Sequence, residues 1–525
     1  MSKIAIIDLS FYYGDYFHPV FENVNLVLDT DWKLGLIGRN GRGKSTFLKL
    51  LMGELAPTAG NISMSVNMEY FPYEPDGKYH QTLDVVKEAV GGLTTMEARM
   101  EELAADLEAG QYEQYCQVQT EYAELGGYEM EGLILKEMAL MGLPEELAYR
   151  DFAALSGGEL TRMMIIALFL RPNSFVLLDE PTNHLDITGK ELMAEYLRRK
   201  KGFIVVSHDR DFLDIVTDHI MSINKSNINV EKGNYSSWRE NMDRVEEYEF
   251  RTRDRLEREV RELERRSKQT RGWAGEANTQ KYAFKCNART NGSQSYMRQA
   301  KRSEEQILDN LEEKKKLLLN YEVAKTLTIE QREGDSQECL LKAEKLSFAY
   351  SGGEPLFENV NFSLHAGDRA WIKGRNGAGK STFLKILTGE RKVASVIEYV
   401  PELRVAVSAQ EPLWTEGLIG GKFDLPAQQK AYQRFLELCD SFDLPENFLE
   451  RPLETFSSGE LKKVDIARAL AEEGDILFLD EPLNYMDVYF REQLEKAILE
   501  SEPTMVFVEH DSRFGKNVSN KVLEL

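Results

Sequence analysis

GRNGRGKST, residues 38–46, follows the apolar segment KLGLI and precedes the helix-like segment FLKLLMG. This stretch decides the fold, because a glycine-rich turn between a strand and a helix lets successive backbone N–H groups point at phosphate oxygens. The helix also presents its positive N-terminal end to the same anion. GRNGAGKST, residues 374–382, repeats the pattern. The sequence therefore predicts an α/β fold with two phosphate-binding loops.

The second loop belongs to an internal duplication that covers most of the chain. Further pairs of segments recur in the same order: FYYG and FAYS, FENVNLVL and FENVNFSL, LSGGEL and FSSGEL, VLLDEP and LFLDEP, and VVSHD and FVEHD. The loops begin at residues 38 and 374, 336 residues apart, whereas the serines at 156 and 457 are 301 apart. The first copy therefore carries about 35 extra residues with a helical pattern, and we expect a helical arm there.

Three parts follow from this duplication, which suits a chain of 525 residues because a single core rarely extends that far. We expect a first α/β domain at 1–240, with the arm at about 76–149, and a second α/β domain at 337–525. These are called the first and second domains below. Residues 241–336 between them have the charge-rich pattern of an antiparallel helical hairpin, with a tip at about 265–302.

Composition excludes several classes of protein. The N-terminal MSKIAIIDLS has no basic segment followed by an apolar one, and no stretch approaches the roughly 20 apolar residues that span a bilayer. The four cysteines (Cys116, Cys286, Cys339 and Cys439) lack the spacing of a zinc site or a disulfide scaffold. We therefore expect a cytoplasmic protein without a membrane segment.

The two loops predict ATP and Mg²⁺ as cofactors. Lys44 and Lys380 would reach the β- and γ-phosphates, and the hydroxyls of Ser45 and Ser381 would bind Mg²⁺, which prefers oxygen ligands. The predicted nucleotide-binding residues of the loops are Gly38, Asn40, Gly41, Gly43, Lys44, Ser45 and Thr46, and Gly374, Asn376, Gly377, Gly379, Lys380, Ser381 and Thr382.

Paired carboxylates end the buried-strand patterns FVLLDE and ILFLDE. Since ligands of parallel α/β sheets lie at the carboxyl ends of the strands, these acids should face the nucleotide. Asp179 and Asp480 would hold Mg²⁺, while Glu180 and Glu481 would orient and deprotonate the attacking water. The chain is thus predicted to hydrolyse ATP.

Two further residue types recur in both copies. His208 and His510 each follow an apolar strand and could contact the γ-phosphate, the alternative being a buried structural role. Tyr13 and Tyr350 precede each loop and could stack on adenine, with core packing as the alternative.

LSGGE opens a helix, and with it the sequence resembles the ATP-binding-cassette superfamily, whose two domains clamp two ATP molecules between them. The resemblance implies that Ser156, Gly157, Gly158 and Glu159 complete the site of Lys380, and that Ser457, Ser458, Gly459 and Glu460 complete the site of Lys44. It also implies a Mg²⁺ contact for Gln410, where the first domain has Tyr73. Ser458 replaces Gly157, and Tyr485 replaces His184. The two sites are therefore expected to turn over unequally.

The hairpin tip differs in charge from the rest of the chain. Between Arg265 and Arg302 there are ten basic residues and one acid, Glu276, in a protein of net charge −23. Interleaved aromatic rings suit phosphate contacts combined with stacking on unpaired bases; the alternative is a solvated loop whose rings hold the hairpin together. The RNA-contact candidates are Arg271, Trp273, Lys281, Tyr282, Phe284, Lys285, Arg289, Tyr296 and Arg298.

Two fused cassettes, EPTNHLD and a hairpin linker resemble the ABC-F family, most closely its Lsa-type antibiotic-resistance branch. The resemblance implies a monomer, with its two ATPase domains paired and no obligate protein subunit. Its partner would be the ribosome, with the linker near 23S rRNA, the P-site tRNA and the peptidyl transferase centre. It further implies protection against lincosamides, streptogramin A and pleuromutilins. The main alternative is a housekeeping translation factor. The basic tip and the missing membrane segment oppose a subunit that energises efflux. The cysteine spacing gives no support to a DNA-repair ATPase.

Overall fold

The computed structural model describes residues 2–14, 19–75, 77–105, 109–183, 185–224, 227–245, 247–248, 251, 255, 258, 327–331, 339–350, 355–375, 377–393, 396–423, 428–445 and 447–525. The chain divides into two compact units: Met1–Ser236 together with Thr326–Leu525, and Ser237–Lys325. Both α/β domains belong to the first of these units. The predicted tip at 265–302 lies outside the described residues.

The first domain is built on two sheets. A six-stranded sheet has the order β5-β6-β7-β3-β8-β9, and a three-stranded antiparallel sheet has the order β2-β1-β4. The strands are β1 (Lys3–Phe11), β2 (Phe21–Asp29), β3 (Lys33–Gly38), β4 (Ala59–Ser63), β5 (Asn67–Phe71), β6 (Ser174–Asp179), β7 (Phe203–Val206), β8 (His219–Ile223) and β9 (Ile228–Lys232). In the larger sheet β9 pairs antiparallel with β8, and the other neighbours are parallel.

The second domain repeats this plan. Its parallel sheet has the order β14-β15-β16-β12-β17, and its antiparallel sheet has the order β11-β10-β13. The strands are β10 (Cys339–Ala349), β11 (Pro355–His365), β12 (Arg369–Lys373), β13 (Ile397–Tyr399), β14 (Val405–Ser408), β15 (Ile476–Asp480), β16 (Met505–Val508) and β17 (Lys521–Glu524). The matching strand orders confirm the predicted tandem α/β fold.

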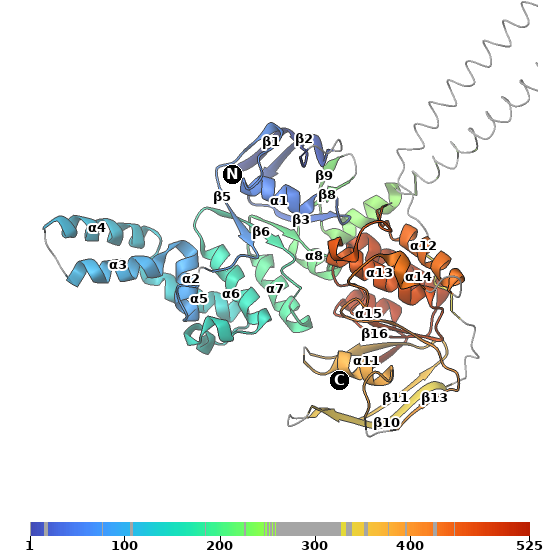
Figure 1. Cartoon of the computed structure of the whole chain (residues 1–525). Coiled ribbons are helices and arrows are strands. Elements are labelled where there is room, and N and C mark those ends of the chain that lie inside the picture. The colour runs from blue at the N-terminus through green and yellow to red at the C-terminus, as the bar shows by residue number, and fades with distance from the viewer. Residues whose placement is uncertain are drawn as a thin grey trace, which may run out of the picture. The chain divides into compact units, whose positions relative to one another are not determined.

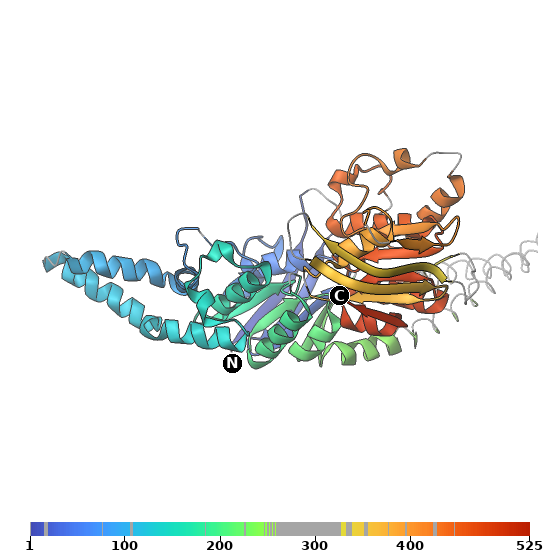
Figure 2. The same cartoon turned by 90° about the horizontal axis from the view of Figure 1, so that it is seen from below.

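Several helices also correspond between the domains, and the first domain has additional ones. Those of the first domain are α1 (Lys44–Met52), α2 (Thr82–Gly91), α3 (Leu93–Ala105), α4 (Ala109–Glu124), α5 (Gly127–Leu140), α6 (Gly157–Leu170), α7 (Ile187–Arg199) and α8 (Arg210–Val216). Those of the second are α11 (Lys380–Leu387), α12 (Gln429–Ser441), α13 (Ser458–Ala471), α14 (Val488–Ser501) and α15 (Ser512–Val518). Figures 1 and 2 both show α3 and α4 running side by side away from the sheets, within the segment where the sequence indicates an arm.

Short apolar strands form the centre of each domain. The FVLL segment of β6 and all of β7 are buried, as are β15 and β16. A parallel strand that is buried on both faces has no solvent side, and this explains why these segments are continuously apolar rather than alternating. Because parallel strands share one carboxyl edge, Asp179 and Asp480 at the ends of β6 and β15 are placed beside the phosphate-binding loops.

Candidate functional site

The two phosphate-binding loops have the same backbone geometry. Gly43 and Gly379, the residues before α1 and α11, have φ angles of 91° and 89°. A Cβ atom at Gly43 would lie 2.7 Å from Cγ1 of Val20 and 3.0 Å from Cζ of Phe21. The loop therefore needs glycine both for its left-handed backbone and for the space beside β2.

A lysine ammonium closes each loop. Lys44 Nζ donates to Gly38 O at 2.7 Å and to Asn40 Oδ1 at 3.2 Å. Lys380 Nζ donates to the carbonyl oxygens of Gly374 and Arg375, both at 3.0 Å. The ammonium groups are thus held over the turns that Ser45 and Ser381 follow, and this donor arrangement fits a polyphosphate.

Burial lowers the pKa of both lysines, and nearby carboxylates oppose that shift. For Lys44 the opposing acids are Asp487, Glu180 and Asp179; for Lys380 they are Glu481, Asp480 and Asp186. Each lysine is therefore influenced by one aspartate of the other domain, Asp487 or Asp186.

The predicted catalytic glutamates have an unusual backbone. Glu180 and Glu481 have φ angles of 52° and 48°. Their N–H groups donate to Val206 O at 2.9 Å and Val508 O at 3.0 Å, the last residues of β7 and β16. Left-handed backbone at a residue with a side chain costs energy and gathers at functional sites. The same conformation occurs in both copies, which favours a functional role for the two glutamates.

The residues around Asp179 and Asp480 fit a magnesium ion by their chemistry. Ser381 Oγ donates to Asp480 Oδ1 at 3.2 Å, so two predicted ligands of the second site are in contact. In the first site, the hydroxyl of Tyr70 donates to Asp179 Oδ2 at 3.1 Å. Hydroxyl and carboxylate oxygens are the donors that Mg²⁺ prefers. The ion would neutralise charge on the β- and γ-phosphates when bound.

The surroundings of the two glutamates differ. His208 Nε2 lies 3.1 Å from Glu180 Oε1, and His510 Nε2 lies 3.5 Å from Glu481 Oε1. Burial raises the pKa of Glu180 to about 8 and lowers the pKa of His208 well below its usual value. Burial also acts on Glu481, but hydrogen bonds from His510, Asn484 and Gln410 outweigh it and lower the pKa of that carboxyl. The two sites are therefore not equivalent.

The first phosphate-binding loop makes direct contacts with the second domain. Asn40 N donates to Asp487 Oδ2 at 2.8 Å, and Asn40 Nδ2 donates to Tyr485 O at 2.9 Å. A Cβ atom at Gly459 would lie 3.3 Å from the same Nδ2. The start of α13 in the second domain therefore lies beside the loop of Lys44. Below, the first ATP site is the one that contains Lys44, and the second is the one that contains Lys380.

Both serine-led helices begin with a reciprocal capping box. The Ser156 side chain accepts from Glu159 N and the Glu159 carboxylate accepts from Ser156 N; Ser457 and Glu460 do the same. The glutamates are therefore occupied in holding the helix start. The groups of these segments that are suited to bind an anion are therefore the backbone N–H groups at the starts of α6 and α13.

The candidate adenine-stacking tyrosines are not core residues. Tyr13 and Tyr350 are each 47% exposed. Their hydroxyls lie 3.0 Å from Thr46 Oγ1 and 3.1 Å from Thr382 Oγ1, in the first turns of α1 and α11. The rings therefore lie beside the loops, and the Tyr350 ring has the Arg391 guanidinium 4.6 Å from its centroid. Stacking on adenine stays a prediction.

Sequence analysis missed Tyr70. Tyr73, which aligns with Gln410, has the Arg171 guanidinium 5.5 Å from its ring centroid, while Gln410 Nε2 donates to Glu481 Oε2 at 3.2 Å. The aligned position in the first domain thus packs on an arginine, and Tyr70 contacts Asp179, the predicted magnesium ligand. Its place at the carboxyl end of β5, next to β6, is the signal that could have identified it.

Tyr70→Phe is expected to weaken Mg²⁺ binding at the first site by about tenfold, because a hydroxyl that orients a metal ligand contributes on that scale. Binding of Mn²⁺ with ATP, followed by electron paramagnetic resonance in a Lys380→Ala background, measures this directly. Tyr73→Phe is the matched control and should leave the affinity within about twofold. Equal affinities for Tyr70→Phe and the parent would contradict a role for this hydroxyl.

Several predicted positions lie outside the described residues. These are Asn376 of the second loop and the linker candidates Arg271, Trp273, Lys281, Tyr282, Phe284, Lys285, Arg289, Tyr296 and Arg298. Their assignments stay predictions. Among the residues that the structure does describe, no helix combines the length and the apolar character that crossing a bilayer requires.

Comparison with known proteins agrees with the geometry. The sequence matches the family described as "ABC transporter" over residues 21–183 and 357–484. It is 26% identical to the ribosome protection protein VmlR of Bacillus subtilis, over 96% of this chain and 83% of the relative. It is 27% identical to the energy-dependent translational throttle protein EttA of Haemophilus influenzae, over 96% and 89%.

A solved structure shares the fold. The archaeal ribosome recycling factor aABCE1, crystallised with the ribosomal stalk protein aP1, covers 98% of this chain and 87% of its own. The TM-score is 0.58 at 22% sequence identity. At that identity the likeness supports the tandem arrangement of two nucleotide-binding α/β domains, and the site itself is argued from the contacts above.

Proposed function

Because the chain belongs to the ABC transporter family, as an ATPase of the ABC-F type, we propose that it acts on the ribosome in its ATP-bound state. ATP bound between the domains would hold them together, and hydrolysis would release the protein. The observation that carries this proposal is the direct contact of the first loop with the second domain: Asn40 binds both Asp487 and Tyr485. A nucleotide at Lys44 would therefore be bound by both domains.

The proposed roles of the residues in ATP binding and hydrolysis follow from their contacts. Lys44 and Lys380 would bind the phosphates, and Asp179 and Asp480, with the neighbouring serines, would hold Mg²⁺. Glu180 and Glu481 would accept a proton from the attacking water. The histidines, within 3.1 and 3.5 Å of these carboxylates, would sense the γ-phosphate and orient the base.

The ribosome is proposed as partner on charge and on similarity. Residues 265–302 combine ten basic side chains and four aromatic rings in a chain of net charge −23, so the rest of the protein is strongly acidic. Such a segment would be steered to RNA before any other part of the chain. Relatives named as a ribosome protection protein and a translational throttle protein match nearly the whole chain. The segment would reach toward the P-site tRNA and 23S rRNA, and the protein would be cytoplasmic.

Cosedimentation with ribosomes tests this function. The Glu180→Gln, Glu481→Gln double variant should bind ATP but retain it, and should pellet with ribosomes in ATP and remain in the supernatant in ADP. The parent protein should show a weaker difference, because it hydrolyses the nucleotide. If the double variant binds ATP normally yet stays free of ribosomes, the proposal is wrong.

Two roles on the ribosome are open. One is protection against lincosamides, streptogramin A and pleuromutilins; the other is a housekeeping factor that relieves stalling without a drug. Expression in a sensitive strain, with growth measured in lincomycin, virginiamycin M and tiamulin, separates them. Raised inhibitory concentrations, lost in the double glutamine variant, support protection; unchanged concentrations with intact ribosome binding support the housekeeping role.

A further inference from the structure

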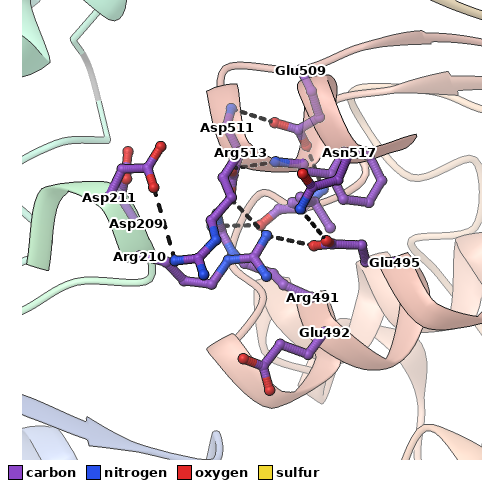
Figure 3. A network of polar contacts seen from close by, with 12 residues as sticks. Asp209, Arg210, Asp211, Arg491, Glu492, Glu495, Glu509, Asp511, Arg513 and Asn517 are labelled. Carbon is purple, nitrogen blue, oxygen red and sulfur yellow. Dashed lines mark hydrogen bonds and ion pairs between the residues drawn. The ribbon is translucent and has the colours of Figure 1, made fainter. Parts of the chain in front are cut away.

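A buried network of charges joins the two domains away from the loops (Figure 3). Arg210, the first residue of α8 in the first domain, is 4% exposed. Its Nη2 donates to Glu495 Oε2 of α14 at 2.6 Å and lies 3.9 Å from Asp511 Oδ2. Burial acts to lower the pKa of Arg210, but Asp511 and Glu495 raise it, so the guanidinium is charged. The Arg210 and Glu495 side chains are 4% and 11% exposed, so removing one partner would leave a buried charge without compensation.

Each charged partner is held by its own domain as well. Glu495 Oε1 accepts from Asn517 Nδ2 at 2.6 Å. Asp511 caps α15 by accepting from Phe514 N at 2.9 Å, and it accepts from Arg491 Nη1 at 3.1 Å. The guanidinium of Arg210 is therefore bound by two carboxylates that the second domain also holds through its own contacts.

Arg491 extends the network toward the first ATP site. Its Nη2 donates to Leu483 O at 2.9 Å and its Nε to Met486 O at 3.1 Å, so one side chain grips the segment 483–487. That segment supplies Tyr485 O and the Asp487 carboxylate, the two acceptors for Asn40 of the first loop. The planar fork of arginine is needed for such a three-way contact.

The positions that the internal repeat relates to Arg210 and Glu495 hold different residues. Helices α8 and α15 are capped by Asp209 and Asp511, so Arg210 corresponds to Ser512. Helices α7 and α14 are capped by Asp186 and Asp487, so their eighth residues, Ala194 and Glu495, correspond. The related position therefore holds a serine and an alanine, which cannot form an ion pair.

The fourth residues of the same two helices also differ. Lys190 stands where the second domain has Arg491, and its Nζ donates to Asp209 Oδ2 at 2.9 Å and to His510 O at 3.4 Å. A lysine has no planar fork with which to hold two carbonyl oxygens and a carboxylate together. The buried Arg210–Glu495 pair and the three contacts of Arg491 thus both involve residues near the first site.

We propose that Arg210 and Arg491 are positioning residues that hold Asp511 and the segment 483–487 of the second domain against the first ATP site. Arg210 lies two residues after His208, which is 3.1 Å from Glu180. The bonds of Arg210 to the second domain therefore help to fix the position of His208 beside Glu180. Arg491 fixes the segment that binds Asn40. Both arginines therefore act on residues of the first site, whereas the second site meets the network at Asp511, which follows His510. Turnover in the first site should depend on these contacts more than turnover in the second site does.

The test measures one site at a time. Glu481→Gln leaves the first site to turn over, and Glu180→Gln leaves the second, an assignment that rests on these two residues being the catalytic bases. Into each background is placed Arg210→Met with Glu495→Gln, which removes both charges and lets residue 495 still accept from Asn517. First-site kcat should fall about tenfold with KM within about twofold, as expected when a catalytic group is misplaced rather than removed. Second-site kcat should stay within about twofold.

Further variants separate positioning from stability. Arg491→Lys installs the residue that the first domain carries, and should lower first-site kcat with little change in the melting temperature. Arg210→Lys, which retains one charged bond to Glu495, should restore more than half of the first-site kcat. Arg513→Gln is a control from the same region. The Arg513 side chain is 36% exposed and its Nη1 lies 3.6 Å from Asp214 Oδ2. This substitution should change turnover at neither site.

Equal losses in the two backgrounds, or no loss in either, would overturn the proposal. A fall in melting temperature with kcat unchanged would also overturn it, because the network would then serve stability alone. If Glu180→Gln, Glu481→Gln together retained full turnover, the assignment of the bases would be wrong instead.

Discussion

Replacing Glu180 and Glu481 together by glutamine is expected to lower ATP turnover by about 10²–10⁴-fold, the range that a positioned general base contributes. Glutamine has nearly the same shape but accepts no proton from water. Each glutamate follows the strand that ends in a predicted magnesium ligand, Asp179 or Asp480, and lies within 3.5 Å of a histidine Nε2. Phosphate release under saturating ATP measures the loss.

ATP binding by the same double variant should remain within about twofold of the parent, because the loops of Lys44 and Lys380 are untouched. Glu195→Gln is a suitable control: this residue pairs with Arg198 on the surface of α7 and is 50% exposed, so its turnover should match the parent. A double variant that retains more than about a tenth of the parental rate would show that these carboxylates are not the bases.

Gly43→Val should abolish nucleotide binding at the first site in practical terms, with a loss of about 3 kcal/mol, or about 100-fold in affinity. Residue 43 has a φ of 91°, which a β-branched side chain adopts only with strain. The new Cβ would also lie 2.7 Å from Val20 Cγ1. The loop would have to open, and its backbone N–H groups would no longer converge on the phosphates.

Calorimetric titration with ATP in a Lys380→Ala background isolates the first site for this measurement. Gly53→Val is the matched control, since residue 53 ends α1 with a φ of 76° and has nothing within 4 Å of a built Cβ. It should cost stability of the fold without reducing ATP affinity. Similar affinities for the two variants would contradict the requirement for glycine in the loop.

The parts of this molecule that sequence predicts are those that depend on local pattern. The strand, turn and helix around Lys44 follow from neighbouring residues, and the duplication gives an independent second copy around Lys380. The buried strands that end at Asp179 and Asp480 are predicted for the same reason: an apolar run of this length is a local signal. The tandem α/β fold is confirmed.

Contacts between distant segments could not be predicted in this way. Arg210 and Glu495 are 285 residues apart, and neither belongs to a recognisable motif. Tyr70 reaches Asp179 only because β5 and β6 are neighbours in the sheet, a fact of topology rather than of sequence spacing. The difference in pKa between Glu180 and Glu481 likewise depends on which polar groups surround each carboxylate in the folded chain.

Tyr73, Ser458 and Tyr485 predict that the two ATP sites turn over at unequal rates, and this stays a prediction. The structure adds physical differences of another kind. Glu481 receives bonds from three side chains, whereas burial raises the pKa of Glu180 to about 8. The buried pair of Arg210 and Glu495 has no counterpart at the positions related by the repeat, Ser512 and Ala194.

Chemical probing of ribosomal RNA tests the central claim most directly. Ribosomes would be saturated with the Glu180→Gln, Glu481→Gln variant and ATP, and the reactivity of each nucleotide compared with ribosomes alone. The account predicts protection of 23S rRNA around the peptidyl transferase centre, which is lost when the basic residues between 265 and 302 are replaced by glutamine. A reactivity profile identical to that of free ribosomes, from a variant shown to hold ATP, would contradict it.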